Sequence, residues 1–160
     1  MSKTSGAKAN WNGKMFEDFV HDNLVRNDFI YTDLKKLPLR NTKGSSKSFT
    51  SQFNLNQTIY GTKWMVDFLL YDAEVNQYLV IECKWQQSPG SVDEKYPYLV
   101  RNIKEQSPYP CLVLLDGDGY KPAAKEWLLT QVDEKLLGVL NMSEFVKWFM
   151  TQDIFSTNQQ

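Results

Sequence analysis

Residues 78–87 of the chain read YLVIECKWQQ, and this stretch decides how the sequence folds. Its first four residues are apolar and include β-branched and aromatic types, so they predict a buried β-strand. Two charged residues, Glu82 and Lys84, then follow within the same run. An ionised group buried in a strand is costly unless something pairs with it. The two charges therefore indicate a polar site built onto the strand.

A second apolar run, KWMVDFLLY at 63–71, precedes this strand and contains one acid, Asp67. The five residues between the runs, DAEVN, suit a hairpin turn. In a two-residue hairpin, a turn at 74–75 sets Asp67 opposite Glu82, and a turn one residue later sets it opposite Lys84. Since side chains alternate along a strand, Glu82 and Lys84 share a face about 7 Å apart. Either register brings Asp67 to that face.

Two carboxylates and one amine on one sheet face suit a reaction centre better than a core. Carboxylate oxygens are ligands that Mg²⁺ prefers, with substrate phosphate completing its coordination. The metal would stabilise charge on a phosphodiester in its transition state. Lys84 would orient or help deprotonate the attacking water and hold phosphate. The alternative interpretations are a Glu82–Lys84 ion pair on a half-exposed strand face and an Asp67 that only ends a strand.

The rest of the chain alternates helices and strands. The expected elements are a helix at about 12–27, a short strand at 29–31, a polar loop at 40–63 with a weak strand at 49–53, a helix from near Pro97, a strand at 111–116, a helix at 122–132, a strand at 136–142 and a last helix capped by Ser143. This order predicts an α/β fold, a mixed α+β sheet with helices on both faces.

Composition favours one globular domain, 1–160, in which residues 1–11 and 156–160 are expected to be flexible. The formal net charge is −1, divided between a basic segment at 1–63 and an acidic remainder. That asymmetry fits a polyanion-binding surface beside a cation site, although chance explains it equally well. The apolar runs are too short to cross a membrane, and the first residues lack the hydrophobic segment of a signal peptide. With two cysteines expected as reduced core thiols, the sequence predicts a cytoplasmic protein.

Asp67, a hairpin and then Glu82-Cys83-Lys84 resembles the PD-(D/E)XK nuclease superfamily, the fold of many restriction endonucleases and Holliday-junction resolvases. The resemblance covers most of the chain, because the order of elements fits that core, αβββαβ. It implies that Asp67 and Glu82, with the backbone carbonyl of Cys83, bind Mg²⁺, for which Mn²⁺ can substitute. It also implies that Lys84 assists hydrolysis. The superfamily's proline is absent, since Val66 precedes Asp67.

Members often add a glutamate on the first helix, and the string GKMFE that ends at Glu17 looks similar, so Glu17 becomes a further candidate for metal binding and catalysis. The string ECKWQQSPGSVDEKYPY resembles small restriction-type nucleases. This makes Gln86 a catalytic candidate and places Glu94 and Lys95 at the rim of the site. Loops and their lysines often contact the nucleic-acid backbone. The lysines expected to contact DNA are Lys43, Lys47, Lys63 and Lys95.

The predicted function is a Mg²⁺-dependent endonuclease that cuts DNA, of restriction or homing type. One active site cuts one strand, so we expect a homodimer or a higher symmetric assembly. One alternative is a Holliday-junction resolvase or repair nuclease of the same fold. Another is a nucleic-acid-binding module without catalysis.

The stretch CLVLLDGDGY at 111–120 resembles the nucleophile motif of haloacid-dehalogenase-type phosphatases, with Asp116 as nucleophile and Asp118 as acid. Tyr120 stands where that family usually has threonine or valine, and the residues after it are too few for the remaining motifs. The stretch also lacks the glycine and glutamate that a calcium loop requires. We therefore expect a strand end, a tight turn and a helix that begins at Pro122.

Overall fold

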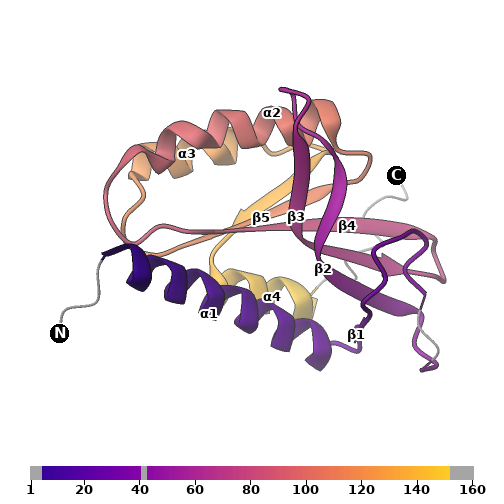
Figure 1. Cartoon of the computed structure of the whole chain (residues 1–160). Helices are drawn as coiled ribbons and strands as arrows, with labels where there is room; N and C mark the ends of the chain where they lie inside the picture. The colour runs from indigo at the N-terminus through magenta and orange to yellow at the C-terminus, as the bar shows by residue number, and fades with distance from the viewer. Residues whose placement is uncertain (1–4, 41–42, 152–160) are drawn as a thin grey trace.

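The computed structural model describes residues 5–40 and 43–151 and confirms an α/β fold, a mixed six-stranded sheet with helices on both faces (Figure 1). The elements are α1 (Ser5–Arg26), β1 (Ile30–Tyr31), β2 (Lys47–Gln57), β3 (Lys63–Asp72), β4 (Gln77–Trp85), the 3₁₀ helix η1 (Ser91–Lys95), α2 (Tyr96–Gln106), β5 (Cys111–Asp116), α3 (Pro122–Thr130), β6 (Leu136–Leu140) and α4 (Met142–Thr151). Within the described residues, every helix is too short or too polar to cross a membrane.

The six strands lie in the order in which they follow one another along the chain. Strands β2, β3 and β4 pair antiparallel, whereas β4, β5 and β6 pair parallel and β1 runs parallel to β2. The β3–β4 register places Phe68 opposite Ile81 and Asp72 opposite Gln77. This register is the one expected for a turn centred on 74–75, although the loop itself has four residues.

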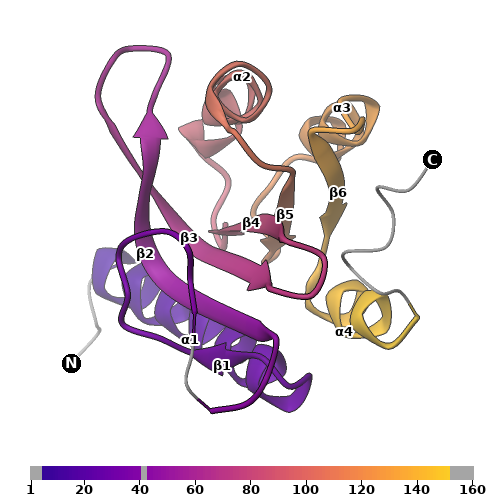
Figure 2. The same ribbon diagram turned by 90° about the vertical axis from the view of Figure 1, so that its right-hand side faces the viewer.

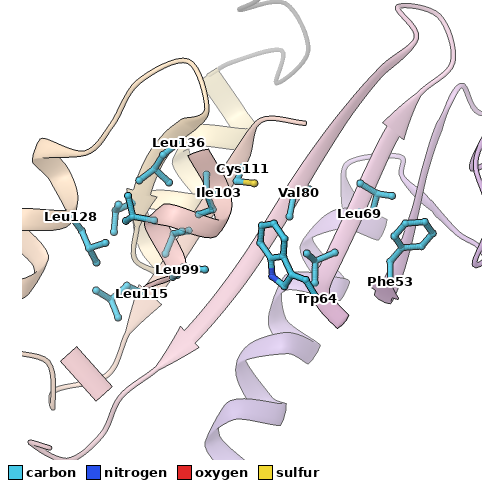
Figure 3. Packing of buried hydrophobic residues seen from close by; sticks show 14 of the residues in the cluster. Phe53, Trp64, Leu69, Val80, Leu99, Ile103, Cys111, Leu115, Leu128 and Leu136 are labelled. Atoms are coloured by element: carbon cyan, nitrogen blue, oxygen red, sulfur yellow. The ribbon is translucent and has the colours of Figure 1, made fainter. Parts of the chain in front are cut away.

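Two apolar clusters form on the two faces of the sheet. Helices α2 and α3 cover one face and α1 and α4 cover the other, as Figure 2 shows. The predicted stripe on α1 is confirmed, since Phe16, Val20 and Leu24 are all buried in the second cluster. Figure 3 shows part of the first cluster, to which β2 to β6, α2 and α3 contribute side chains. Both cysteines are free thiols, and Cys111 lies in this first cluster.

The weak strand predicted at 49–53 is confirmed, but much of the polar loop predicted around it was wrong, because β2 runs over Lys47–Gln57 as an eleven-residue strand. Its sequence, KSFTSQFNLNQ, is mostly polar and has weak intrinsic strand preference. The strand lies between β1 and β3, so neighbouring backbones satisfy its hydrogen bonds. Ser48 and Thr50 are buried together with Phe49 and Phe53. Tertiary pairing has therefore overridden local propensity here.

Two helix boundaries also differ from expectation. Helix α1 begins at Ser5, so residues 5–11, which we expected to be flexible, form its first turns, whereas residues 156–160 lie outside the described residues. Helix α4 is capped by Asn141 and not by Ser143. The Asn141 Oδ1 accepts a hydrogen bond from the Glu144 backbone N–H at 2.8 Å, and the Asn141 N–H donates to Glu144 Oε1 at 3.1 Å. This reciprocal pair is a capping box.

The turn after β5 has the structural role that the sequence predicts. Asp116 accepts backbone hydrogen bonds from Gly117 at 2.7 Å and from Met142 at 2.9 Å, so its carboxylate joins the turn to the start of α4. Gly117 has a φ of +98°, and a Cβ at this residue would lie 2.2 Å from the backbone oxygen of Gln86. The turn therefore packs directly against the chain that leaves β4.

We predict that Gly117→Ala destabilises the protein by at least about 2 kcal/mol, because it combines a left-handed backbone with a backbone clash. Gly13→Ala is the matched control: a Cβ there meets nothing within 4 Å, and replacing a helical glycine should stabilise by about 0.5–1 kcal/mol. Urea unfolding of both variants measures the difference. Equal midpoints for the two variants would contradict this account of the turn.

Candidate active site

Asp67 lies where β3 changes the face toward which its side chains point. Phe68 packs in the cluster beneath α1, whereas Val66 and Trp64 pack in the cluster beneath α2. In a regular strand these three side chains, at alternate positions, would share one face, so β3 departs from regular alternation here. On the neighbouring strand β2, Gln52 has a φ of +48°, which breaks regular strand geometry opposite the change. The β2–β3 hairpin consequently bends out of the sheet and rises beside α2 (Figure 2).

The bend brings the Asp67 carboxylate to the end of the β3–β4 ladder. The last paired residues there are Phe68 and Ile81. Beyond them, Asp67 Oδ2 accepts a hydrogen bond from the backbone N–H of Cys83 at 2.7 Å. Asp67 thus replaces a strand–strand hydrogen bond, and its carboxylate lies beside Glu82 and Lys84 as the sequence predicts.

Glu82 is a buried carboxylate, with its side chain only 3% exposed. Its Oε1 accepts a hydrogen bond from the indole Nε1 of Trp64 at 2.9 Å, and its Oε2 accepts one from Lys84 Nζ at 3.1 Å. The Glu82–Lys84 ion pair exists, but it does not lie on a half-exposed strand face. Two donors from two strands hold the carboxylate in one position, which is a feature of pre-organised sites.

The charges of the site influence one another. Burial raises the pKa of Glu82 to about 7; the Lys84 ammonium opposes this rise, and the Asp67 carboxylate adds to it by its charge and by a side-chain hydrogen bond. Burial alone would lower the pKa of Lys84, but Glu82 and Asp67 raise it above its ordinary value. Two crowded carboxylates, one of them protonated readily, form a site whose electrostatics favour an added cation.

Glu17 approaches the site from α1, on the opposite face of the sheet. Burial and the Asp67 carboxylate raise its pKa, and the Lys84 ammonium lowers it, so Glu17 lies within electrostatic reach of both groups. Among the described residues, no three side chains of histidine, cysteine, aspartate or glutamate are grouped closely enough to hold a metal ion by themselves. The side chains gathered at the site are therefore the Asp67 and Glu82 carboxylates, with Glu17 standing further off.

These donors fit a hard divalent cation such as Mg²⁺, which takes one or two carboxylates and keeps several waters. They do not fit zinc, which favours thiolate and imidazole ligands. Cys83 is the one thiol near the acids, and burial, with the nearby carboxylates, raises its pKa well above its ordinary value. That thiol therefore stays protonated and offers no thiolate to a metal ion.

The carboxylates open into a cleft of about 430 Å³ between the β2–β3 hairpin and α2. Its lining brings together three catalytic candidates and one predicted DNA contact. The lining residues are Thr58, Trp64, Met65, Asp67, Glu82, Lys84, Lys95, Tyr96, Tyr98, Leu99 and Asn102. The site thus has an acidic end, two lysines and a long apolar wall.

Gln86 lies behind the cleft and not within it. It is buried, donates a hydrogen bond to the Gly119 carbonyl at 3.1 Å and accepts one from the Tyr96 hydroxyl at 2.6 Å. Tyr96 in turn lines the cleft. This arrangement assigns Gln86 a positioning contact between the end of β4 and α2, whereas Glu94 is exposed beside Lys95 outside the cleft lining.

The other three lysines predicted to contact DNA lie outside the cleft lining. Lys63, on the rising hairpin, lines a shallow hollow with Asn54, Asn56 and Gln57. Lys47 on β2 lies opposite Asp72 on β3, at the end of the sheet where the β3–β4 turn lies. Asp72 is five residues along β3 from Asp67, or about 17 Å at 3.3–3.4 Å per residue. Lys43 is exposed in the segment before it. The structure does not bring Lys43 or Lys47 to the acids.

Sequence reasoning missed the residues that shape the cleft. Trp64 lies three residues before Asp67 in the sequence, but nothing in the run KWMVDFLLY shows that its indole turns toward Glu82. Thr58, Tyr98 and Asn102 come from the hairpin tip and α2, which only the bend of β2 and β3 brings together. The unusual backbone of Gln52 carries no sequence signal, because glutamine rarely adopts it.

Comparison with known proteins agrees with this geometry. A family model described as a PD-(D/E)XK nuclease superfamily domain matches residues 8–152. The comparison with curated proteins finds no match. Because the family match spans both sheet edges and the whole cleft, the chain belongs to the PD-(D/E)XK nuclease superfamily.

Proposed function

We propose that the protein is a metal-dependent endonuclease that hydrolyses DNA phosphodiester bonds, of restriction or homing type. One observation carries the proposal: Asp67, Glu82 and Lys84 line a single open cleft, together with Lys95. Membership in a nuclease superfamily indicates a phosphodiester hydrolase and a nucleic-acid substrate. The acids would serve little purpose in a protein that only binds DNA, because carboxylates repel phosphate.

In this proposal Mg²⁺, or Mn²⁺ in its place, is held by Asp67, Glu82 and the Cys83 carbonyl, with Glu17 further out. When bound, the metal neutralises developing phosphate charge and favours ionisation of the attacking water. Trp64 keeps Glu82 from rotating away from the site by its 2.9 Å hydrogen bond. A fixed carboxylate loses less orientational freedom when it binds a cation.

Lys84 has two tasks in this mechanism. Its ammonium is 3.1 Å from Glu82 and its side chain is one-third exposed, so it can contact solvent and substrate at once. It orients the attacking water and stabilises negative charge on the phosphate oxygens. Lys95, exposed at the start of α2, contacts a neighbouring phosphate.

Three further points belong to the proposal. One such site cuts one strand, so double-strand cleavage calls for a homodimer or a higher symmetric assembly. Two free thiols support a reducing compartment, the cytoplasm. A junction resolvase or repair nuclease of the same fold is the second candidate, because the cleft has room for an unpaired nucleotide beside the acids.

We predict that the purified protein nicks or cuts plasmid DNA in Mg²⁺ and that Lys84→Ala or Glu82→Gln lowers the rate by at least about 100-fold, the usual magnitude for losing a charge that acts on the transition state. Glu74→Gln is the control, because Glu74 is an exposed acid in the β3–β4 turn, at the opposite end of these strands from the site, and should leave the rate unchanged. Gel analysis of time courses measures each rate. Cleavage that survives both site changes would remove the catalytic assignment.

We also predict that Ca²⁺ stabilises the protein by binding at the acids. At ten times its Kd a ligand adds about 1.4 kcal/mol to the free energy of unfolding, a rise in Tm of roughly 3–5 °C for a chain of this size. Asp67→Asn should abolish the shift, and Glu74→Gln, at the far end of β3 and β4, should keep it. Thermal melts with and without Ca²⁺ provide the readout, which is independent of activity. An unchanged shift in Asp67→Asn would place the cation elsewhere.

A further inference from the structure

The cleft continues well beyond the catalytic acids. A magnesium ion with six waters fills roughly 180 Å³, at about 30 Å³ per water. The cleft holds about 430 Å³, so more than half of its space lies past a hydrated ion. A volume of this kind is within the usual range of sites for small organic molecules. The extra space therefore has the size of a binding site in its own right.

The walls of this extra space are flat and apolar. Trp64 and Leu99 are both buried to more than nine-tenths, and both line the cleft. The Trp64 indole N–H faces Glu82, so its ring leads from the acidic end along the wall. Because so little of either side chain is exposed, the two residues form an apolar floor along the cleft and not a stacking face.

The far end of the cleft is polar and rigid. Asn102 Oδ1 accepts a hydrogen bond from the Ile59 backbone N–H at 2.8 Å, which joins α2 to the hairpin tip. The Thr58 and Thr62 hydroxyls are 2.7 Å apart in the same tip. The Tyr98 hydroxyl shares hydrogen bonds with these threonines and with Asn102, which lowers its pKa. Hydroxyl and amide groups can donate and accept, as the edge of a base requires.

A pair of stacked tyrosines stands at the rim. The Tyr60 and Tyr98 ring centres are 5.0 Å apart with 20° between their planes. Tyr60 is 76% exposed, although it is a large aromatic residue in a well-anchored turn. Its outer face is open to solvent beside a cleft that contains Tyr98. Such a pair is a ready stacking platform for a base.

We propose that the cleft binds one unpaired nucleotide next to the scissile phosphate, so that the preferred substrate class is DNA with single-stranded nucleotides, such as bulges, flaps and gaps. This inference rests on the proposed nuclease function and, within it, favours the repair- or junction-type candidate over the restriction or homing type. The phosphate lies at the acids and Lys84, and the base extends along the cleft past Trp64 and Leu99 to stack on the Tyr60–Tyr98 pair at the rim. A base in paired DNA must first unpair and unstack, at a free-energy cost that an unpaired nucleotide does not incur.

The test compares fluorescent oligonucleotides of one sequence in three forms: single-stranded, fully paired, and paired with one bulged nucleotide. Binding is measured by anisotropy at one salt concentration, with Ca²⁺ replacing Mg²⁺. We expect the single-stranded and bulged forms to bind at least about tenfold more tightly than the duplex, the fold-change that stacking one base supports. A fluorescent base analogue at the bulge should lose intensity on binding, since it stacks in the cleft.

Tyr60→Ala should remove most of that preference, whereas Tyr60→Phe should keep it because the ring remains. Tyr31→Ala removes a tyrosine from the far edge of the sheet and should change nothing. Equal affinity for all three forms, or a preference that survives Tyr60→Ala, overturns the inference. If duplex DNA is nonetheless cut with Mg²⁺, the nuclease proposal still holds. Selective binding of unpaired DNA with no cleavage of any form supports the pocket and overturns the nuclease proposal.

Discussion

The hydrogen bonds of the buried Glu82 carboxylate are the constraint on which the site depends. A carboxylate inside a folded protein is tolerated only when donors replace the water it has lost. Trp64 on β3 and Lys84 on β4 provide those donors at 2.9 and 3.1 Å. Removing either partner would leave one carboxylate oxygen without its donor, so the Glu82 hydrogen bonds join the hairpin to β4.

The second constraint is the bend of β3 at Asp67. A straight strand would continue its ladder with β4 and close the space between them. The ladder instead ends at Phe68 and Ile81, and Asp67 accepts the N–H of Cys83. The departing strand then packs its apolar side chains against α2, which compensates for the pairing that is lost. The opening between β3 and β4 is thus stabilised by this core as well as by the hydrogen bonds of Asp67 and Glu82.

Much of this arrangement was predictable from sequence. The alternation in YLVIECKWQQ and KWMVDFLLY placed Asp67, Glu82 and Lys84 together, because a half-buried hairpin has few registers that keep its core. Prediction failed where tertiary contacts decide. β2 is too polar to indicate a strand alone. Gln86 stands two residues after Lys84, so strict alternation would place it on the same face as Glu82 and Lys84. However, β4 ends at Trp85, and the Gln86 side chain instead bonds to the Tyr96 hydroxyl. The alternation of side chains predicts a face only within a strand and not beyond its end.

One structural element links the candidate metal ligands to the shape of the cleft. The β2–β3 hairpin provides Asp67 at its base, Trp64 on its inner wall and Thr58 near its tip. Its tip is fixed to α2 by the Ile59–Asn102 hydrogen bond and by the stacked tyrosines. A change at the tip therefore reaches the acids through the strand that carries both. Because Asp67, Trp64 and Thr58 all belong to this hairpin, and its tip is joined to α2, the far end of the cleft is fixed in position relative to the acids.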